Sequence, residues 1–319
     1  MALSESERLA RIEGGLLGLL VGDALGVPYE FHGPKAIPPR EQIEFRPPAV
    51  YYRSHYGTEP GTWSDDGATA LALLDSLLTC GQFDAEDLGA RLVAWRDQGR
   101  YAVDERVFDI GIQTDKALTA IAQGTPALAA GSTEERALGN GSLMRVLPLA
   151  LWSKGSDAEL VADAMAQSRV THGHLRAQVC CALYCLWARA TLNGAEPGDA
   201  WASAGATLRG MWPESGPERA ELEFHIRPDD PPEGQGQGYV VDALRSARWA
   251  VTTTASYEEA VKAAVALGND TDTTACIAGE IAGLYYGVDG IPQRWRDGLR
   301  GREIYEPLRD ALLAWRSRT

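Results

Sequence analysis

The chain has 319 residues, of which 45% are hydrophobic and 23% are charged, with 34 glycines and 17 prolines. This composition excludes a disordered, collagen-like or low-complexity protein, and the length suffices for one large domain or two ordinary ones. Lys and Arg number 30 against 44 Asp and Glu, and the formal net charge of −14 disfavours binding to nucleic acid or anionic lipid.

In chain order, the N-terminal residues lack the layout of a signal peptide, because charged residues precede any apolar stretch. The apolar run 16–21 is stopped by a charge well short of the thickness of a membrane. The five cysteines lack the paired CxxC spacing of a zinc site, so we expect buried thiols in a reducing compartment. These features predict a soluble, cytoplasmic protein with neither a membrane nor a nucleic acid as partner.

Apolar residues recur at three- and four-residue steps along most of the chain, whereas alternating strand patterns are scarce. Gly14, Gly18 and Gly22 are four residues apart and predict close packing of a first helix against a partner helix. The further helices predicted from periodicity and cap residues are Asp66 to Gly81, Asp84 to Gln98, Asp109 to Gly124, 158–167, 174–192, 239–251, Ser256 to Leu267, 273–286 and 304–316. The pattern is typical of an all-α protein.

Two stretches interrupt this helical pattern. Residues 31–61 contain six prolines and several aromatic residues, and proline prevents one continuous helix there. We expect an ordered surface loop. Residues 213–238 are rich in Pro, Gly and Glu and suit either a domain linker or an insertion.

Two short acidic clusters, residues 61–67 and 268–274, each directly precede a predicted helix. A single Asp such as Asp66 or Asp270 is explained as an N-cap, but an N-cap needs one oxygen and each cluster offers two or three. If the clusters meet in space, their carboxylates repel each other unless protons or cations lie between them. Oxygen ligands without imidazole or thiolate suit hard ions such as Mg²⁺, Mn²⁺ or Ca²⁺. The sequence alone does not show that they meet; if they do, 213–238 is an insertion within one domain.

Six motifs follow one another along nearly the whole chain: 18–26 (GLLVGDALG) followed by Glu30, 63–66 (WSDD), 108–111 (FDIG), 139–145 (GNGSLMR), 171–174 (THGH) and 268–273 (GNDTDT). In this order they resemble the ADP-ribosylglycohydrolases, specifically the bacterial dinitrogenase reductase-activating glycohydrolase branch. The resemblance implies an all-α orthogonal helical bundle with a binuclear metal cleft. It also implies a single domain over residues 1–319, with 31–61 and 213–238 as loop insertions.

The resemblance also implies which residues bind metal. Two divalent cations, Mg²⁺ or Mn²⁺, are implied as cofactors, with ligands from both acidic clusters: Ser64, Asp65, Asp66, Asp270, Asp272 and Thr273. Ser64 and Gly67 both stand where the family usually has Thr. The change at Ser64 keeps the hydroxyl, and the change at Gly67 removes no evident ligand.

Glu30 and Asp109 match the family's catalytic carboxylates. From the residues alone, a solvated loop charge is the favoured interpretation of Glu30, and an N-cap is the favoured interpretation of Asp109. The substrate-binding residues implied are Gly139, Asn140, Gly141, Ser142 and His172. Two glycines allow backbone N–H groups to approach a diphosphate, and a following helix N-terminus favours its charge, although a plain turn has the same pattern.

Three further residues or segments leave alternatives open. Arg145 is interpreted as a structural ion pair rather than a phosphate clamp. His172 has either a pocket-lining or a structural hydrogen-bonding role. One of the tyrosines in 51–56 is a candidate to stack on adenine.

The predicted function is metal-assisted hydrolysis of an N-glycosidic bond. The substrate implied is a protein carrying ADP-ribosyl-arginine, with ADP-ribose as the product and water attacking the anomeric carbon of the distal ribose. Glu30 and Asp109 share the acid and base roles in an order that the sequence does not assign. Alternatives are another linkage or small substrate of the serine or O-acetyl type, a silent ADP-ribose-binding protein, a two-metal phosphoesterase, or an immunity role using the same chemistry.

Overall fold

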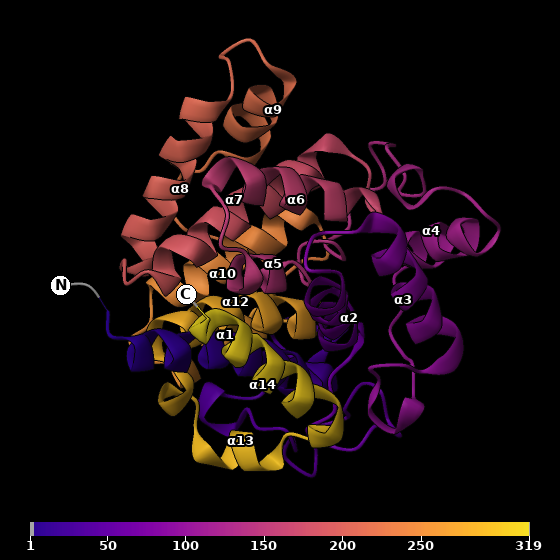
Figure 1. The fold of residues 1–319 in the computed structure, drawn as a ribbon. Coiled ribbons are helices and arrows are strands. Elements are labelled where there is room, and N and C mark those ends of the chain that lie inside the picture. The colour runs from indigo at the N-terminus through magenta and orange to yellow at the C-terminus, as the bar shows by residue number, and fades with distance from the viewer. Residues whose placement is uncertain (1–2, 319) are drawn as a thin grey trace.

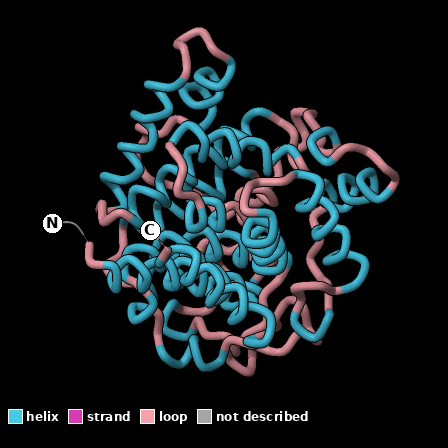
Figure 2. The backbone as a smooth tube through the Cα atoms, viewed as in Figure 1, coloured by secondary structure: helices cyan, strands magenta, loops and turns pink. Residues whose placement is uncertain are grey.

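Helices account for the regular secondary structure of residues 3–318, the part of the chain that this computed structural model describes (Figure 2). Within that part no strand occurs, and two isolated bridges pair extended backbone, Ser132 with His172 and Gly139 with Tyr239. The helices are α1 (Glu5–Gly26), α2 (Asp65–Cys80), α3 (Ala85–Gln98), α4 (Ile112–Ala122), α5 (Leu147–Trp152), α6 (Asp157–Arg169), α7 (Leu175–Leu192), α8 (Pro197–Met211), α9 (Pro217–Ala220), α10 (Val240–Thr252), α11 (Tyr257–Val265), α12 (Thr271–Tyr286), α13 (Gln293–Gly298) and α14 (Arg302–Ser317). The predicted all-α class is confirmed.

Helices α1 and α12 pack against each other near the centre of the molecule (Figure 1). The glycine face of α1 makes this approach possible, because a Cβ atom at Gly18 would clash with the carbonyl oxygen of Gly279. A Cβ at Gly26 would likewise clash with the backbone of Asp272. The predicted close packing is confirmed, with α12 as the partner. The two helices are antiparallel, so the end of α1 lies beside the start of α12.

Cap residues mark most helix ends where the sequence predicts them. Asp84 accepts two backbone N–H hydrogen bonds at the start of α3, and Gly99 ends that helix with a φ of 72°. At the start of α11 the Ser256 hydroxyl accepts from the N–H of Glu259 at 3.2 Å. The Glu259 carboxylate accepts instead from the N–H of Ala255, so only half of the predicted capping box forms.

The start of α4 differs from the prediction. The helix begins at Ile112 with Gly111 as its N-cap, three residues after Asp109. Asp109 has a φ of 61°, which is a left-handed conformation that L-residues other than glycine rarely adopt. The N-cap alternative for Asp109 is therefore wrong, since its backbone turns away from the helix before the helix begins.

The two interrupting segments have different structures. Residues 31–61 are irregular except for a 3₁₀ turn at Arg40–Gln42. Residues 213–238 include α9 and a π-helical turn at Glu221–Ile226, so this segment is partly helical rather than only loop. Helix α8 was not predicted; the Glu196 carboxylate and Pro197 at its first position set its start. Helices α8 and α9 project from one end of the molecule (Figure 1).

The apolar core runs through the whole bundle and includes most of the cysteines. All five thiols are free; Cys80 is partly exposed, and the buried ones are Cys180, Cys181, Cys185 and Cys276. The buried-thiol prediction therefore holds except at Cys80. Among residues 3–318, the helices are too short or too polar for any of them to cross a bilayer.

One ionisable group is buried in this core away from the acidic clusters. The Glu280 carboxyl on α12 accepts a hydrogen bond from the Tyr184 hydroxyl on α7, and its Oε1 has no partner. Burial raises the pKa of Glu280 well above its usual value, and the Tyr184 hydrogen bond opposes this only in part. The folded protein therefore favours the protonated form of Glu280 more strongly than the unfolded chain does.

Folding thus takes up a proton at Glu280, and this makes the stability fall as pH rises above the unfolded pKa. Glu280→Gln keeps the size of the side chain and its hydrogen-bond acceptor but does not ionise. Above the pKa of Glu280 in the unfolded chain, we expect its free energy of unfolding to rise relative to the parent chain by up to about 1.4 kcal/mol per pH unit. Urea unfolding with chelator at pH 5, 6.5 and 8 measures the difference. An equal difference at all three values would show that the carboxyl is already ionised in the folded state.

Candidate active site

A cleft of about 520 Å³ opens at the first turns of α2, α4 and α12. Residues from distant parts of the sequence line it, among them Glu30, Asp65, Asp109, Asn140, His172 and Asp270. The antiparallel packing of α1 on α12 places the Glu30 segment, which follows α1, beside the start of α12. Helix N-termini favour negative charge, so three helix starts around one cleft suit acidic side chains and anionic ligands.

The structure brings the two acidic clusters together. The Thr273 hydroxyl of the second cluster donates to Oδ2 of Asp66 in the first, at 3.4 Å. Carboxylate oxygens of Glu30, Asp270 and Asp272 all lie within 4.8 Å of one another. The two acidic turns and Glu30, which are far apart in the sequence, therefore meet beside the cleft.

These carboxyl groups carry a large electrostatic penalty. Burial, with repulsion from neighbouring carboxylates, raises the pKa of Asp65, Asp66 and Asp272 well above the usual value. Oδ1 of Asp66 and Oδ2 of Asp272 are buried without any hydrogen-bond partner. Unpartnered buried oxygens in an acidic cluster match the donor set that hard divalent cations prefer. The cleft thus holds oxygen donors close enough to bind a metal ion.

Asp23 has a structural role here that the sequence analysis missed. It is fully buried on α1, and its carboxylate accepts from the N–H of Ser64 at 2.9 Å and of Gly67 at 2.8 Å. Asp23 thereby satisfies N–H groups at the start of α2 and fixes the first acidic cluster on α1. A Cβ at Gly67 would clash with the Trp63 ring, which explains glycine at that position. The sequence did carry a signal for this role: Asp23 is a charged residue within the otherwise apolar C-terminal part of α1, and a buried charge needs partners.

Glu30 and Asp109 lie together at one side of the cleft. Burial first, and then the charge of Asp270, raises the pKa of Asp109 to about 6. Burial and the nearby Asp109 also raise the pKa of Glu30. The solvated-charge alternative for Glu30 is therefore wrong, because its side chain is only 5% exposed. Two neighbouring carboxyl groups with raised pKa values suit the roles of general acid and general base.

His55 also contacts this pair, and nothing in the sequence marked it. Its Nε2 lies 2.5 Å from Oε2 of Glu30, and its ring packs at 4.9 Å from the ring of Phe108. His55 belongs to the proline-rich segment 31–61 and is 25 positions from Glu30 in the sequence. The segment therefore reaches the cleft and holds one of its carboxyl groups.

The glycine turn forms another part of the cleft wall. Gly139, Asn140 and Gly141 line the cleft, and a Cβ at Gly141 would clash with the His172 ring. The amide of Asn140 donates to Oδ2 of Asp270 at 2.8 Å, so Asn140 orients a member of the second acidic cluster. Burial lowers the pKa of His172 to about 3, which keeps its imidazole neutral. His172 lines the cleft and also packs on the turn.

Two expectations around this turn need correction. Ser142 is fully buried and bonds to the Ser168 hydroxyl at 2.8 Å, so it does not face the cleft. No helix N-terminus follows the turn directly, because α5 begins only at Leu147. The N-terminal turn of α4 lines the cleft instead.

Arg145 and the loop tyrosines also differ from expectation. The Arg145 guanidinium is buried and donates to Gln167 Oε1 and to the Gly141 carbonyl, each at 3.0 Å, so its role is structural without an ion pair. Tyr51 packs on Tyr29 with ring centroids 5.2 Å apart. Within the described residues, no tyrosine of 51–56 lines the cleft, so none is placed to stack on adenine there.

Comparison with known proteins gives consistent relationships. The sequence model of the ADP-ribosylglycohydrolase family matches residues 4–318. A Pseudomonas putida (strain GB-1) protein named "ADP-ribosylarginine hydrolase Tri1" is 33% identical over 296 residues, which span 92% of this chain and 75% of that protein. The Rhodospirillum rubrum protein named "ADP-ribosyl-[dinitrogen reductase] glycohydrolase" is 30% identical, with 95% and 96% of the two chains covered.

A solved structure shares the fold as well. It is described as "ADP-ribosylglycohydrolase-related protein complex", superposes with a TM-score of 0.78 at 33% identity, and covers 98% of this chain and 99% of its own. The match over the whole chain and the cleft with its paired acidic turns agree with each other. The chain therefore belongs to the ADP-ribosylglycohydrolase family.

Proposed function

We propose that the protein hydrolyses the N-glycosidic bond between ADP-ribose and an arginine side chain of a modified protein, with two divalent cations as cofactors. The single observation that carries this proposal is the convergence of the two acidic turns, in which Thr273 contacts Asp66 at 3.4 Å. The names of the Pseudomonas putida and Rhodospirillum rubrum relatives support an ADP-ribosyl substrate.

The residues that would hold the cations come from the starts of α2 and α12. They are Ser64, Asp65, Asp66, Asp270, Asp272 and Thr273. Asp66 Oδ1 and Asp272 Oδ2 support this set of metal ligands, because both are buried oxygens with no hydrogen-bond donor, and a bound cation would satisfy them. When bound, Mg²⁺ or Mn²⁺ supplies Lewis acidity to sugar hydroxyls and to water.

Glu30 and Asp109 are the groups that move protons. Water attacks the anomeric carbon of the distal ribose, the bond from that carbon to the guanidine nitrogen breaks, and the nitrogen takes the bonding electron pair. One carboxyl group donates a proton to the departing nitrogen, and the other accepts a proton from the attacking water. Their proximity to each other and to Asp270 keeps one of them protonated near neutral pH.

The wall formed by the glycine turn and α4 binds the diphosphate in this proposal. The backbone N–H of Gly141 and the first turn of α4 provide donors, and the N–H of Gly139, which donates to Gln113 Oε1 at 3.3 Å, joins them if that side chain moves aside. Neutral His172 lines the same wall and adds a donor or acceptor for the ribose. Asn140 holds Asp270 in place rather than binding phosphate.

The decisive assay incubates the purified protein with arginine-linked and serine-linked ADP-ribosyl peptides and with O-acetyl-ADP-ribose. Each is tested with Mg²⁺, with Mn²⁺ and with chelator, and free ADP-ribose is quantified. We expect release of intact ADP-ribose from the arginine-linked peptide only, and loss of release with chelator. Release of phosphate would instead indicate a phosphoesterase, and ADP-ribose binding in calorimetry without turnover would indicate a silent family member.

A further inference from the structure

The segment that supplies His55 also carries an unusual exposed surface. Of the eight large hydrophobic side chains that are exposed in the described part of the chain, four belong to residues 31–56. Val50, Tyr52 and Tyr56 are 97%, 80% and 79% exposed. With Arg46 and Arg53 they surround a hollow of about 510 Å³, and we call these five residues the Arg46–Tyr56 patch.

The charge of this patch is opposite to that of the protein. Between Glu44 and Glu59 the sequence contains no Asp or Glu, although the whole chain has a net charge of −14. Among the described residues, neither Arg46 nor Arg53 forms an ion pair. Arg106 adds a third guanidinium at the edge, where it donates to the carbonyl of Gly57. Cationic and aromatic groups therefore meet the solvent together on an acidic molecule.

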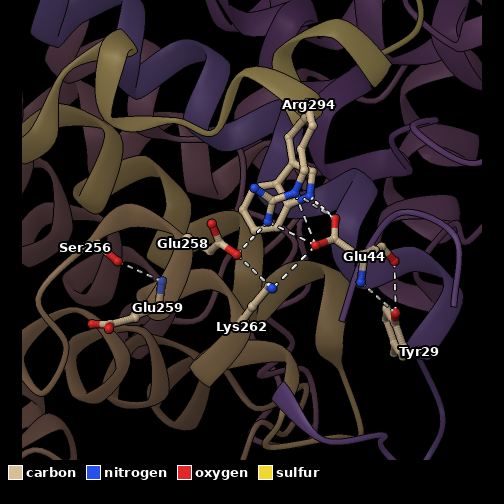
Figure 3. Close-up of polar contacts among 8 residues, drawn as sticks. Tyr29, Glu44, Ser256, Glu258, Glu259, Lys262 and Arg294 are labelled. Atoms are coloured by element: carbon tan, nitrogen blue, oxygen red, sulfur yellow. Dashed lines mark hydrogen bonds and ion pairs between the residues drawn. The ribbon is translucent and has the colours of Figure 1, made fainter. Parts of the chain in front are cut away.

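The base of the segment is firmly held. Glu44 lies between Tyr29 on one side and Lys262 and Arg294 on the other (Figure 3). The Tyr29 hydroxyl donates to the Glu44 carbonyl at 2.9 Å and accepts from its N–H at 3.0 Å, while Arg294 pairs with the Glu44 carboxylate at 3.0 Å. The Trp295 indole N–H also donates to that carboxylate at 2.6 Å. The backbone that leads into the patch is therefore anchored at Glu44.

His55 and Phe31 connect the patch to the lining of the cleft. His55, next to Tyr56, contacts Glu30 on its inner side. Its ring also packs at 5.7 Å from the ring of Phe31, which is 71% exposed and lines the cleft. A ligand that fills the cleft and extends outward past Phe31 thus meets the patch next.

We propose that the Arg46–Tyr56 patch docks the protein that carries the ADP-ribose, through an acidic and apolar surface beside the modified residue. This inference rests on the proposed function, since it gives the partner of the same cleft. Arginine and tyrosine dominate the energetics of protein interfaces because they combine broad apolar area with directional polar groups. Carboxylates of the partner pair with Arg46 and Arg53, and apolar side chains fill the hollow. The small ADP-ribosyl group itself lies in the cleft and makes no use of the patch.

The test compares substrates that differ only outside the cleft. The probes are free ADP-ribosyl-arginine and three 21-residue peptides with a central ADP-ribosyl-arginine, flanked by Glu and Leu, by Ser and Gly, or by Lys. Ten flanking residues reach about 33 Å when fully extended, so each flank continues well past the modified arginine. We expect kcat/KM to be roughly tenfold higher for the Glu and Leu peptide than for the Ser and Gly peptide. This ratio should fall at high salt, because salt screens the charge pairing.

The double variant Arg46→Glu, Arg53→Glu and the double variant Tyr52→Ser, Tyr56→Ser should each remove this preference, chiefly through KM. Both should leave kcat/KM on free ADP-ribosyl-arginine unchanged within twofold. Arg8→Glu, about 27 Å along α1 from its C-terminal end, and Phe224→Ser are matched controls that should keep the preference.

Binding of the unmodified Glu and Leu peptide, measured by fluorescence anisotropy, separates docking from chemistry. Weaker binding of this peptide by the patch variants supports docking at the patch, whether or not any substrate is hydrolysed. Absence of hydrolysis would contradict only the proposed function. Equal binding by the parent chain and the patch variants would overturn the docking proposal. Equal or tighter binding of a 20-nucleotide single strand would also overturn it, by showing a general polyanion site.

Discussion

Asp66→Ala and Asp272→Ala are each expected to lower kcat on ADP-ribosyl-arginine by at least about 10³-fold, because several kcal/mol of metal-assisted stabilisation are lost. Each change removes a buried carboxylate with an unpartnered oxygen. The measurement is single-turnover release of ADP-ribose at saturating Mg²⁺ or Mn²⁺. Turnover within tenfold of the parent chain in either variant would contradict the assignment of these residues to the metal site.

Thermal unfolding distinguishes metal loss from misfolding. The parent chain should gain several degrees in Tm with Mg²⁺ or Mn²⁺ over chelator, because a ligand of the folded state stabilises it. The variants should lose that gain while their Tm in chelator stays near that of the parent, since removing a crowded carboxylate also removes repulsion. Asp199→Ala, an exposed Asp in the first turn of α8, is the matched control and should keep both activity and the metal-dependent gain.

Asp109→Asn is expected to lower kcat on ADP-ribosyl-arginine by about 10²- to 10⁴-fold with little change in KM, because a proton-transfer group is lost. Asn tolerates left-handed backbone, so the variant keeps the φ of 61° that positions this side chain. The control Asp115→Asn lies on the exposed face of α4 and should change kcat by less than twofold.

A second substrate assigns the role of Asp109. An ADP-ribosyl pyridinium releases a neutral pyridine that needs no proton, whereas the guanidine does. If Asp109 is the acid, Asp109→Asn loses much less activity on the pyridinium substrate than on ADP-ribosyl-arginine. Equal losses on both assign Asp109 as the base and leave the acid role to Glu30. An unchanged kcat on both substrates would remove Asp109 from the proton-transfer step.

The local sequence predicted those helix ends that depend on residues near them in the chain. The ends of α3 were predicted correctly because Asp84 satisfies nearby N–H groups and Gly99 adopts a left-handed conformation without a Cβ clash. The start of α4 was predicted wrongly because Asp109 has a left-handed backbone and lies beside Glu30 in the cleft, three residues before the helix begins. The capping box at Ser256 forms only in part because two backbone N–H groups compete for the Glu259 carboxylate. It accepts from the N–H of Ala255 rather than from that of Ser256.

The sequence by itself determined the all-α class, most helix ends and two acidic turns whose oxygens suit hard cations, because periodicity and capping act within a few residues. Only the tertiary structure decided that those turns meet, that Asp23 holds one of them, and that His55 reaches Glu30. These contacts join residues 25 to more than 200 positions apart. They depend on how closely the glycine face of α1 lets α12 approach and on where Glu44 anchors the proline-rich segment, and no local pattern encodes either distance.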